Sequence, residues 1–261
     1  MSETKAKNAP GGSVKQSVSQ QEWDARVNLA AAFRIAYHLG WNDRVVNHIT
    51  ARVPDAPGHF LMNPHELGWH EITASCLVKA DFDGNVLSEG AGDLAPAGLN
   101  FHSAILKQKP DVNCVFHTHP QAGVVISATR CGLKILDQTG CMLHGDVSYH
   151  GFEGYARETD EASGIVQDLG DHKAMIMWNH GLLTVGRTIG EGFSFMRRLI
   201  GACELHERVM ALGTEIREIP VDVLDHTKAQ MLQRRPNQPL GGPEWQMNRR
   251  LADQLYPDYK T

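Results

Sequence analysis

Two histidines that are two positions apart, His117 and His119, follow the apolar run that begins at Val112. Because side chains of a β-strand alternate between its faces, both imidazoles leave the same face of the predicted strand. Two imidazoles on one face are a natural start for a metal site, since catalytic zinc sites usually combine three protein ligands with an open position. Taken alone, the pair is equally compatible with hydrogen-bonded structural histidines.

A third candidate ligand, His180, lies in Asn179-His180-Gly181, between two apolar segments that we predict to be strands. Functional groups are commonly presented from loops at strand ends. Taken alone, this tripeptide favours an ordinary hairpin turn in which Asn and Gly adopt positive φ. Only in combination with His117 and His119 does it predict a three-histidine metal site.

The elements that must position these histidines follow from hydrophobic periodicity and capping signals. Ser19-x-x-Glu22 and Thr188-x-x-Glu191 are capping boxes, which predict a helix ending near Gly40 and a long amphipathic helix through Val209. Further helices are predicted over 99–108, 120–129 and 159–169. Strands are predicted over 45–53, 59–62, 76–81, 85–87, 112–118, 133–136, 147–149, 174–178 and 182–185. Strands that arrive as hairpins between helices predict an α/β fold with antiparallel pairs covered by helices.

The chain divides into three predicted segments. Residues 1–18 are rich in Ser, Lys, Gly and Gln and should form a disordered N-terminal arm. Residues 19–219 should form one folded domain, which is a length that supports a substantial core. Residues 220–261 are rich in Pro and Gln, and we expect a C-terminal extension that either wraps around another subunit or is a loose end.

Composition and charge exclude several classes of function. A net charge of −5 and a pI near 6.3 provide no basic surface for nucleic acid or an anionic membrane. The five cysteines are odd in number and irregularly spaced, which predicts reduced thiols. Residues 1–20 contain no apolar signal segment, and no apolar run approaches the roughly 20 residues that span a bilayer. We therefore expect a cytoplasmic protein that binds a small molecule.

Three ordered motifs resemble the class II aldolase and adducin N-terminal domain family. They are Gly98-Leu-Asn-Phe-His102-Ser-Ala-Ile, Pro110-Asp-Val-Asn-Cys-Val-Phe-His117-Thr-His119 and Asn179-His180-Gly-Leu-Leu-Thr-Val-Gly186. The resemblance covers roughly residues 20–215. It implies a three-layer α/β/α sandwich around a mostly antiparallel sheet, and a homotetramer with its site at a subunit boundary. It also implies that the three histidines bind Zn²⁺, although imidazole equally serves Mn²⁺, Fe²⁺ and Co²⁺.

The departures from the family pattern concern the catalytic acid and the phosphate site. The acid expected four residues before His102 is replaced by Gly98. The family's phosphate-binding loops, Gly-Asn-x-Ser, Thr-x-Ser-Gly and Ser-Ser, are replaced by Asn47-His48-Ile49-Thr50, Thr73-Ala74-Ser75-Cys76 and Pro96-Ala97. Lost glycines and hydroxyls remove close backbone approach and donors, so a phosphorylated sugar is a poor substrate. In these respects the chain is closer to the adducin-like branch, whose cytoskeletal members tend to lack the intact histidine set.

Four further residues are candidates for substrate contact or proton transfer. His102 is expected to face the site from its helix, as a fourth ligand, a substrate hydrogen-bond partner or a packed core histidine. Glu71 could supply the missing carboxylate, and the alternative is a solvated surface charge. Tyr149 and Glu153 lie where the resemblance places a tyrosine that reaches a neighbouring subunit's site, although a surface loop explains them equally well.

Together these features predict a divalent-metal-dependent lyase that cleaves a carbon–carbon bond by retro-aldol chemistry. Its substrate would be a small, non-phosphorylated hydroxy- or oxo-carboxylate, and His48 could donate one hydrogen bond to such an anion. A decarboxylase of a hydroxylated acid is the alternative reaction. From another class, the alternative is a non-catalytic adducin-like interaction module. An open coordination position favours the enzyme, whereas a closed four-residue shell favours the module.

Overall fold

The computed structural model describes residues 11–88, 92–154, 159–233 and 238–261. Within these residues the centre of the fold is a seven-stranded sheet in the order β3-β2-β1-β4-β7-β6-β5. Neighbouring strands are antiparallel except for the parallel pair β5 and β6. The strands are β1 (His48–Val53), β2 (Ala56–Met62), β3 (Val78–Asp81), β4 (Cys114–Thr118), β5 (Val147–His150), β6 (Ala174–Met177) and β7 (Gly181–Gly186). The predicted α/β class and mostly antiparallel sheet are confirmed.

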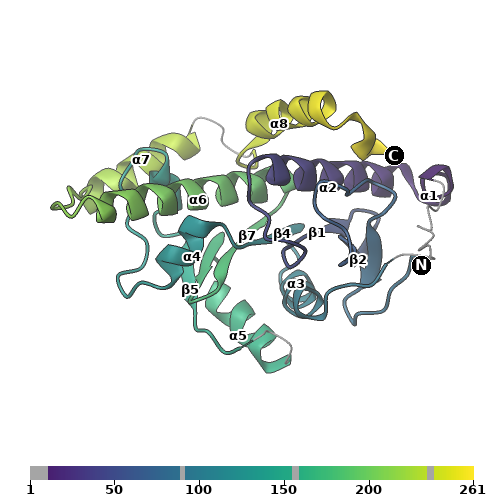
Figure 1. The fold of residues 1–261 in the computed structure, drawn as a ribbon, viewed down its shortest axis with the longest axis horizontal. Coiled ribbons are helices and arrows are strands. Elements are labelled where there is room, and N and C mark those ends of the chain that lie inside the picture. Colours follow the sequence, from purple (N-terminus) through teal and green to yellow (C-terminus); the bar gives the residue numbers. More distant parts are fainter. Residues whose placement is uncertain (1–10, 89–91, 155–158, 234–237) are drawn as a thin grey trace, which may run out of the picture.

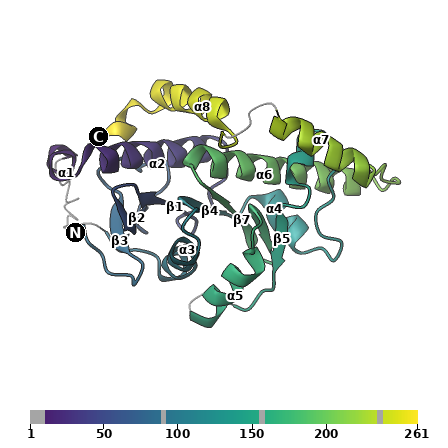
Figure 2. The same cartoon turned by 180° about the vertical axis from the view of Figure 1, so that it is seen from behind.

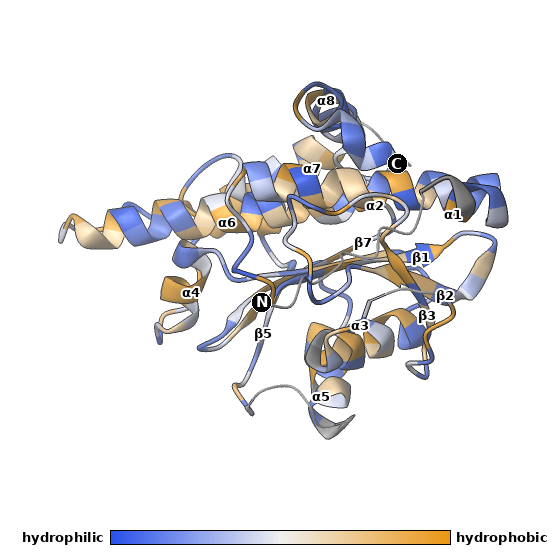
Figure 3. Cartoon of the chain, turned by 45° about the vertical axis from the view of Figure 1, so that its right-hand side comes forward, coloured by the Kyte–Doolittle hydropathy of each residue, from blue (hydrophilic) through white to orange (hydrophobic). Residues whose placement is uncertain are grey.

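Helices cover both faces of this sheet, as Figure 1 and the view from behind in Figure 2 show. Helices α2 and α6 lie on one face with α8 on their outer side, and α3 and α5 lie on the other face (Figure 3). The helices are α1 (Gly11–Ser17), α2 (Gln20–His38), α3 (Pro96–Gln108), α4 (Gln121–Ser127), η1 (Gly140–Leu143), α5 (Thr159–Leu169), α6 (Ile189–Ala211), α7 (Val221–Gln233), α8 (Gly242–Leu255) and η2 (Pro257–Lys260). The predicted three-layer α/β/α sandwich is confirmed. Among the described helices, none has the length and apolar character needed to cross a membrane.

Both predicted capping boxes begin the two long helices of the fold. The Ser19 hydroxyl accepts a hydrogen bond from the backbone N–H of Glu22, at 3.0 Å, where α2 begins. The Thr188 hydroxyl accepts one from the backbone N–H of Glu191, at 3.1 Å, where α6 begins. Each bond satisfies a donor that the first turn of a helix leaves unpaired, which explains why the boundaries could be predicted from sequence.

Strand β4 lies between β1 and β7, and its side chains alternate between the two cores of the sandwich. Cys114 and Phe116 belong to the core that includes α2 and α6, whereas Val115 belongs to the core that includes α3 and α5. His117 therefore lies on the face of Val115. Its ring packs against Phe101 of α3, with the two ring centroids 5.2 Å apart. The end of β4 thus directs His117 toward the space beside α3.

Two of the predicted strands do not form in the described part of the chain. Residues 133–136 are irregular, because backbone N–H groups at the start of this segment donate to the side chains of Tyr149 and His206 instead of to a sheet. Residues 85–87 contribute only a single bridge to β3. Apolar patterning alone could not reveal that these backbone donors find side-chain partners.

The N-terminal segment is more ordered than its composition predicts. Residues 11–17 form α1, so the expectation of disorder is wrong for this part of the predicted arm, and residues 1–10 lie outside the described residues. The reason is packing: Val14 and Val18 contact the main core, and the ammonium group of Lys15 lies 5.6 Å from the ring centroid of Trp23. Two apolar contacts and one cation–π contact order a segment that is otherwise polar.

The C-terminal extension folds back on its own chain. Helix α8 packs against α2 and α6, and Trp245 and Tyr259 are 6% and 0% exposed. The carbonyl of Tyr259 accepts a hydrogen bond from the backbone N–H of Ala74. The expectation of a loose end is therefore wrong for residues 242–261. Contact of the extension with another subunit stays a prediction, as does the division at residue 219.

Candidate metal centre

His117, His119 and His180 converge where β4 ends and β7 begins. Their ring centroids lie 4.7 Å (His117 to His119), 4.8 Å (His117 to His180) and 4.9 Å (His119 to His180) apart. One nitrogen from each ring lies within 4.8 Å of the other two. The structure thus brings together the three residues that the sequence predicted as metal ligands.

The outer partners of two of these rings select their tautomers. Nδ1 of His117 lies 3.1 Å from the carbonyl oxygen of Leu182, which can only accept, so this Nδ1 carries the proton. Nδ1 of His119 faces a carboxylate oxygen of Asp43 at 3.5 Å. The two Nε2 atoms then present lone pairs to each other at 2.9 Å. Such lone pairs repel unless a cation lies beside them, so the donor set fits a divalent ion, with the outer partners that metal-binding histidines usually have.

Burial lowers the pKa of all three histidines. The pKa of His117 lies well below its usual value because of burial and then because of neighbouring His119. Burial lowers the pKa of His180 to about 4. Burial also lowers the pKa of His119, against an opposing effect of the hydrogen bond to Asp43. Since a metal ion binds the neutral imidazole, these shifts keep the donors available at neutral pH.

The backbone of the turn that carries His180 depends on the two residues that flank it, Asn179 and Gly181. Asn179 has a φ of 53°, in the left-handed region that Asn tolerates better than most residues. A Cβ at Gly181 would lie 2.5 Å from Cδ2 of His119 and 2.7 Å from the carbonyl oxygen of Thr118. Gly181 is therefore required for close approach of the turn to His119, and not for a positive φ as the sequence suggested.

The three histidines open into a cavity of about 420 Å³. Its walls include the apolar residues Val46, Pro96, Phe101 and Phe152, and the charged pair Asp43 and Arg44 also lines it. The size and the mixture of apolar wall and few polar groups are typical of a site for a small molecule.

Two further histidines, His48 and His65, line the same cavity. His48 is 4% exposed, and its pKa is lowered to about 3 by burial and then by the charges of nearby histidines, His119 first. Across the described residues, neither ring nitrogen of His48 has a hydrogen-bond partner, and Nδ1 of His65 also lacks one. The cavity therefore contains polar atoms that the protein itself does not satisfy.

His102 and Glu71, two of the predicted catalytic residues, lie outside the three-histidine cluster. His102 is fully buried on α3, and its Nδ1 lies 2.9 Å from the hydroxyl of Thr50. Burial, and then His48, hold the pKa of His102 well below its usual value. Glu71 is exposed, and its carboxylate accepts a hydrogen bond from the backbone N–H of Gly68 at 2.8 Å. Neither residue lines the cavity, and their catalytic roles stay predictions.

Tyr149 and Glu153, the other two candidates, do not line the cavity. The Tyr149 hydroxyl accepts a hydrogen bond from the backbone N–H of Leu133 at 3.0 Å, and its ring stacks on Trp178 with centroids 4.6 Å apart. Glu153 is exposed and lies between Phe152 and Gly154, which both line the cavity. Their roles also stay predictions, and Glu153 is the better placed of the two.

Sequence reasoning missed Asp43 and His65 as residues of this site. Asp43 precedes Arg44, which has a φ of 47°, in a loop whose path no sequence spacing reveals. His65 follows β2 in a loop with no distinctive motif around it. The signal that could have drawn attention to His65 is the sequence's content of 14 histidines, which is too weak to select one of them.

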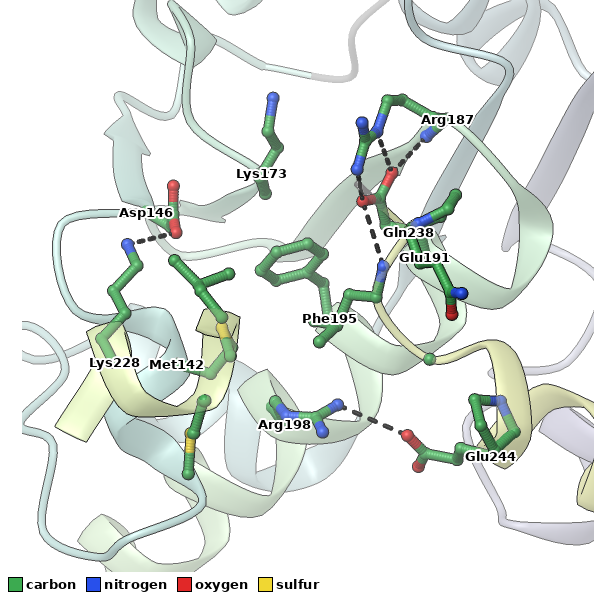
Figure 4. Close-up of a pocket in the computed structure, with 16 residues that line it drawn as sticks. Met142, Asp146, Lys173, Arg187, Glu191, Phe195, Arg198, Lys228, Gln238 and Glu244 are labelled. Atoms are coloured by element: carbon green, nitrogen blue, oxygen red, sulfur yellow. Dashed lines mark hydrogen bonds and ion pairs between the residues drawn. The ribbon is translucent and has the colours of Figure 1, made fainter. Parts of the chain in front are cut away.

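A second cavity, of about 640 Å³, lies between α6 and the C-terminal extension (Figure 4). Six of its charged groups form ion pairs, Arg187 with Glu191, Lys228 with Asp146, and Arg198 with Glu244, and Lys173 also lines it. It contains none of the three clustered histidines. Although it is the larger cavity, the groups that could do chemistry lie in the smaller one.

The comparisons with known proteins agree with this geometry. The profile of the family described as Class II Aldolase and Adducin N-terminal domain matches residues 27–206. A Pseudomonas aeruginosa protein named as a candidate class 2 aldolase is 38% identical over 249 residues, which are 95% of this chain and 96% of that protein. Mouse alpha-adducin is 36% identical over 88% of this chain, which matches 32% of the adducin.

Two solved structures are similar over almost the whole chain. An aldolase II superfamily protein from Pseudomonas syringae has a TM-score of 0.88 and 37% identity, and the match covers 95% of this chain and 99% of that one. An L-fuculose 1-phosphate aldolase from Glaciozyma antarctica PI12 has a TM-score of 0.79 and 28% identity, with 93% of each chain covered. The resemblance inferred from three sequence motifs thus extends over the full fold.

Proposed function

Since the chain belongs to the class II aldolase and adducin N-terminal domain family, we propose that it is a divalent-metal-dependent carbon–carbon lyase. Its substrate is a small, non-phosphorylated hydroxy- or oxo-carboxylate. The observation that carries this proposal is the cluster of His117, His119 and His180. A carbonyl and a carboxylate hold the outer nitrogens of His117 and His119, and the Nε2 atoms of these two rings face each other.

A divalent ion held there supplies a Lewis acid for a substrate carbonyl oxygen and for the negative charge that develops as a carbon–carbon bond breaks. The chain's own residues hold the metal-binding rings in place and shape the cavity for the substrate. Leu182 and Asp43 fix two of the imidazole rings, and Phe101 and Phe152 form an apolar wall that excludes water from part of the cavity. A cavity of about 420 Å³ suits a substrate of few carbon atoms.

The similarity to an L-fuculose 1-phosphate aldolase supports aldolase-type chemistry but does not extend to the phosphate. A phosphate dianion needs several convergent donors and close backbone approach. Pro96, which has no N–H, lies in the cavity wall, and the imidazole of His48 occupies the place of the family's phosphate-binding Asn. A carboxylate carries less charge and needs fewer donors, which favours it as the anionic group.

An interaction module without catalysis is the second candidate, and the 36% identity to alpha-adducin favours it. The intact histidine cluster opening into a cavity favours the enzyme instead, because a structural metal site would be closed by a fourth residue. A decarboxylase would use the same ion and cavity, and the products distinguish it from the aldolase.

We expect purified protein to bind one divalent ion per chain, and His119→Ala to lose it while the fold is retained. Metal analysis and circular dichroism measure both properties. His172→Ala is the control, since this histidine lies outside the cavity and bonds a backbone carbonyl. Full metal stoichiometry and unchanged affinity in His119→Ala would contradict the assignment.

The substrate class is tested by screening hydroxy- and oxo-acids for release of pyruvate, aldehyde or CO₂. We expect fuculose 1-phosphate and ribulose 5-phosphate to react far more slowly than the best carboxylate. A kcat/KM of roughly 10⁴ M⁻¹s⁻¹ or above on either sugar phosphate, the ordinary enzyme range, restores the sugar-phosphate assignment. Release of CO₂ without an aldehyde identifies the decarboxylase.

A further inference from the structure

His48 lies beside the metal centre because of the register of the sheet. It begins β1 and is the cross-strand partner of His117 in the antiparallel pair of β1 and β4. Directly opposed residues of such a pair project from the same face of the sheet. The two imidazoles are nearly parallel, with ring centroids 6.4 Å apart and planes inclined by 13°. His48 is thus adjacent to the ligands without belonging to their cluster.

The ring of His48 is buried in the cavity wall with its hydrogen-bonding capacity unused. It is 4% exposed, and throughout the described ranges both Nδ1 and Nε2 lack a protein partner. A buried polar group without a partner is destabilising, and native structures keep few of them. An imidazole that lines a cavity and carries an unused N–H is a donor available to a bound molecule.

Gly98 makes this position of His48 sterically possible. A Cβ built on Gly98 would lie 2.5 Å from Nδ1, 2.6 Å from Cγ and 2.7 Å from Cε1 of His48. Cγ is the root of the ring, so the imidazole could not evade that contact without changing its rotamer. The same glycine stands where the resemblance expects a catalytic acid, and the His48 ring therefore occupies the space into which a side chain at residue 98 would project.

We propose that His48 contacts the substrate, donating a hydrogen bond to its carboxylate beside the metal centre, and that Gly98 is the positioning residue that seats the His48 ring. The inference rests on the proposed function of the same cavity and adds the residue that recognises the anion. Nδ1 of His65, which also lacks a partner in the described chain, lies in the same wall as a second donor.

A carboxylate suits this subsite better than a phosphate. One or two neutral imidazoles offer few N–H groups, and the adjoining wall at Ala95 and Pro96 is apolar. The arginine of the cavity wall, Arg44, is paired with Asp43 at 3.1 Å. Each carboxylate group carries a single charge, which is less costly to desolvate beside His48 than the double charge of a phosphate group. The low pKa of His48 agrees with a neutral ring that donates from one nitrogen.

The first experiment measures anion binding, not turnover. Zinc-loaded wild type, His48→Leu and His48→Asn are titrated calorimetrically with oxalate and with inorganic phosphate. We expect oxalate affinity to fall about 10- to 100-fold in His48→Leu, the loss typical of a hydrogen bond to a charged oxygen. His48→Asn, which keeps an N–H donor, should lie between the two. Phosphate should bind wild type more weakly than oxalate does.

A matched control separates this effect from the loss of any buried histidine. His59 also has an Nδ1 without a described partner, but it lies on β2 outside the cavity wall. His59→Leu should bind oxalate like wild type, and all variants should keep their zinc. Unchanged oxalate affinity in His48→Leu overturns the proposal, and loss of zinc there shows that His48 is a ligand instead.

The second experiment tests the pairing with Gly98 by thermal unfolding of the metal-loaded protein. Replacing a helical glycine by alanine ordinarily raises Tm. We expect Gly98→Ala to lower Tm and weaken oxalate binding, because the ring of His48 is displaced. In a His48→Ala background the same substitution should raise Tm. Additive effects of the two substitutions overturn the positioning role of Gly98.

The outcomes keep the inference and the proposed function apart. If wild type binds zinc but does not bind oxalate, the proposed carboxylate subsite is wrong and the assignment of the metal centre is unaffected. Oxalate binding that depends on His48, in a protein that cleaves none of the screened acids, contradicts the lyase and supports the subsite. Protein that does not bind zinc at all contradicts both.

Discussion

At the scale of single residues, the three clustered histidines could be predicted because their signal is local. Strand alternation directs His117 and His119 to one face, and the ordered motifs add His180. Asp43 could not be predicted, because its place beside His119 depends on the path of a loop. The role of Gly98 could be noticed as a missing acid, but only the structure shows which ring fills the space.

The buried histidines also determine how the metal-free protein responds to acid. Burial lowers the pKa of His102 and His117 well below the usual value, that of His48 to about 3 and that of His180 to about 4. In the unfolded chain these residues titrate near about 6.5. Below that pH the unfolded state binds more protons than the folded state, so the free energy of unfolding decreases as the pH is lowered.

We therefore expect the metal-free protein to be most stable above about pH 6.5 and to lose stability between about pH 6 and pH 4. Each such histidine contributes up to about 1.4 kcal/mol per pH unit in this window. Urea unfolding of chelator-treated protein at pH 7, 6 and 5 measures the slope. His102→Gln should reduce this slope by the contribution of one histidine, up to about 1.4 kcal/mol per pH unit. A free energy of unfolding that does not change with pH would contradict the burial of these rings as neutral groups.

At the scale of elements, segments with both an apolar period and a capping signal were predicted well. Helix α5 matches its predicted bounds, and α2 and α6 begin at their predicted caps. The predictions failed where tertiary contacts determine the structure. In residues 133–136 the backbone N–H groups donate hydrogen bonds to side chains, and the C-terminal extension packs on the helices of its own chain. Trp245 of α8 was among the missed residues, although it is one of the largest buried side chains of that extension.

Trp245 tests whether α8 is an integral part of the fold. Its ring lies 5.4 Å from that of Phe193, centroid to centroid, and its indole N–H donates to the side-chain oxygen of Asn28 at 3.3 Å. We expect Trp245→Ala to lower the free energy of unfolding by about 3–5 kcal/mol, the usual cost of removing a buried aromatic ring. Urea unfolding measures it, and Met247→Ala is the control on the same helix, because Met247 is 48% exposed. Equal small effects of both substitutions would show that α8 is only loosely attached.

At the scale of the whole molecule, two features bear on assembly: exposed apolar side chains on two helices, and the small number of carboxylates in the described wall of the cavity. Helices α6 and α7 run beyond the edge of the sheet (Figure 1). Leu212, at the end of α6, and Val221 and Leu232, at the two ends of α7, are 73%, 64% and 52% exposed. The described wall of the cavity has one carboxylate, Asp43, which already contacts Arg44 and His119. An apolar surface and a site without a further acid are both consistent with a second copy of the chain.

We propose that the protein is a homo-oligomer, most simply the homotetramer that the family resemblance implies, in which Tyr149 or Glu153 reaches the cavity of a neighbouring copy. Stable assemblies of this kind bury on the order of 2,000 Å² or more per interface. Light scattering at micromolar concentration should give about four times the mass of the 28.8 kDa chain. Leu232→Glu, which places a charge on the exposed face of α7, should shift the population toward smaller species.

Subunit mixing tests whether the neighbour completes the site. His119→Ala removes a ligand from the cavity, and Glu153→Gln removes a carboxylate that is exposed at its rim. If the acid acts in the adjacent copy, each variant is inactive alone, but a mixed oligomer contains sites with an intact His119 from one chain and an intact Glu153 from another. Activity on the substrate found by screening should then reappear after the two proteins are unfolded and refolded together. A strict monomer by light scattering refutes the assembly, whereas an oligomer without recovered activity places the missing acid within the same chain.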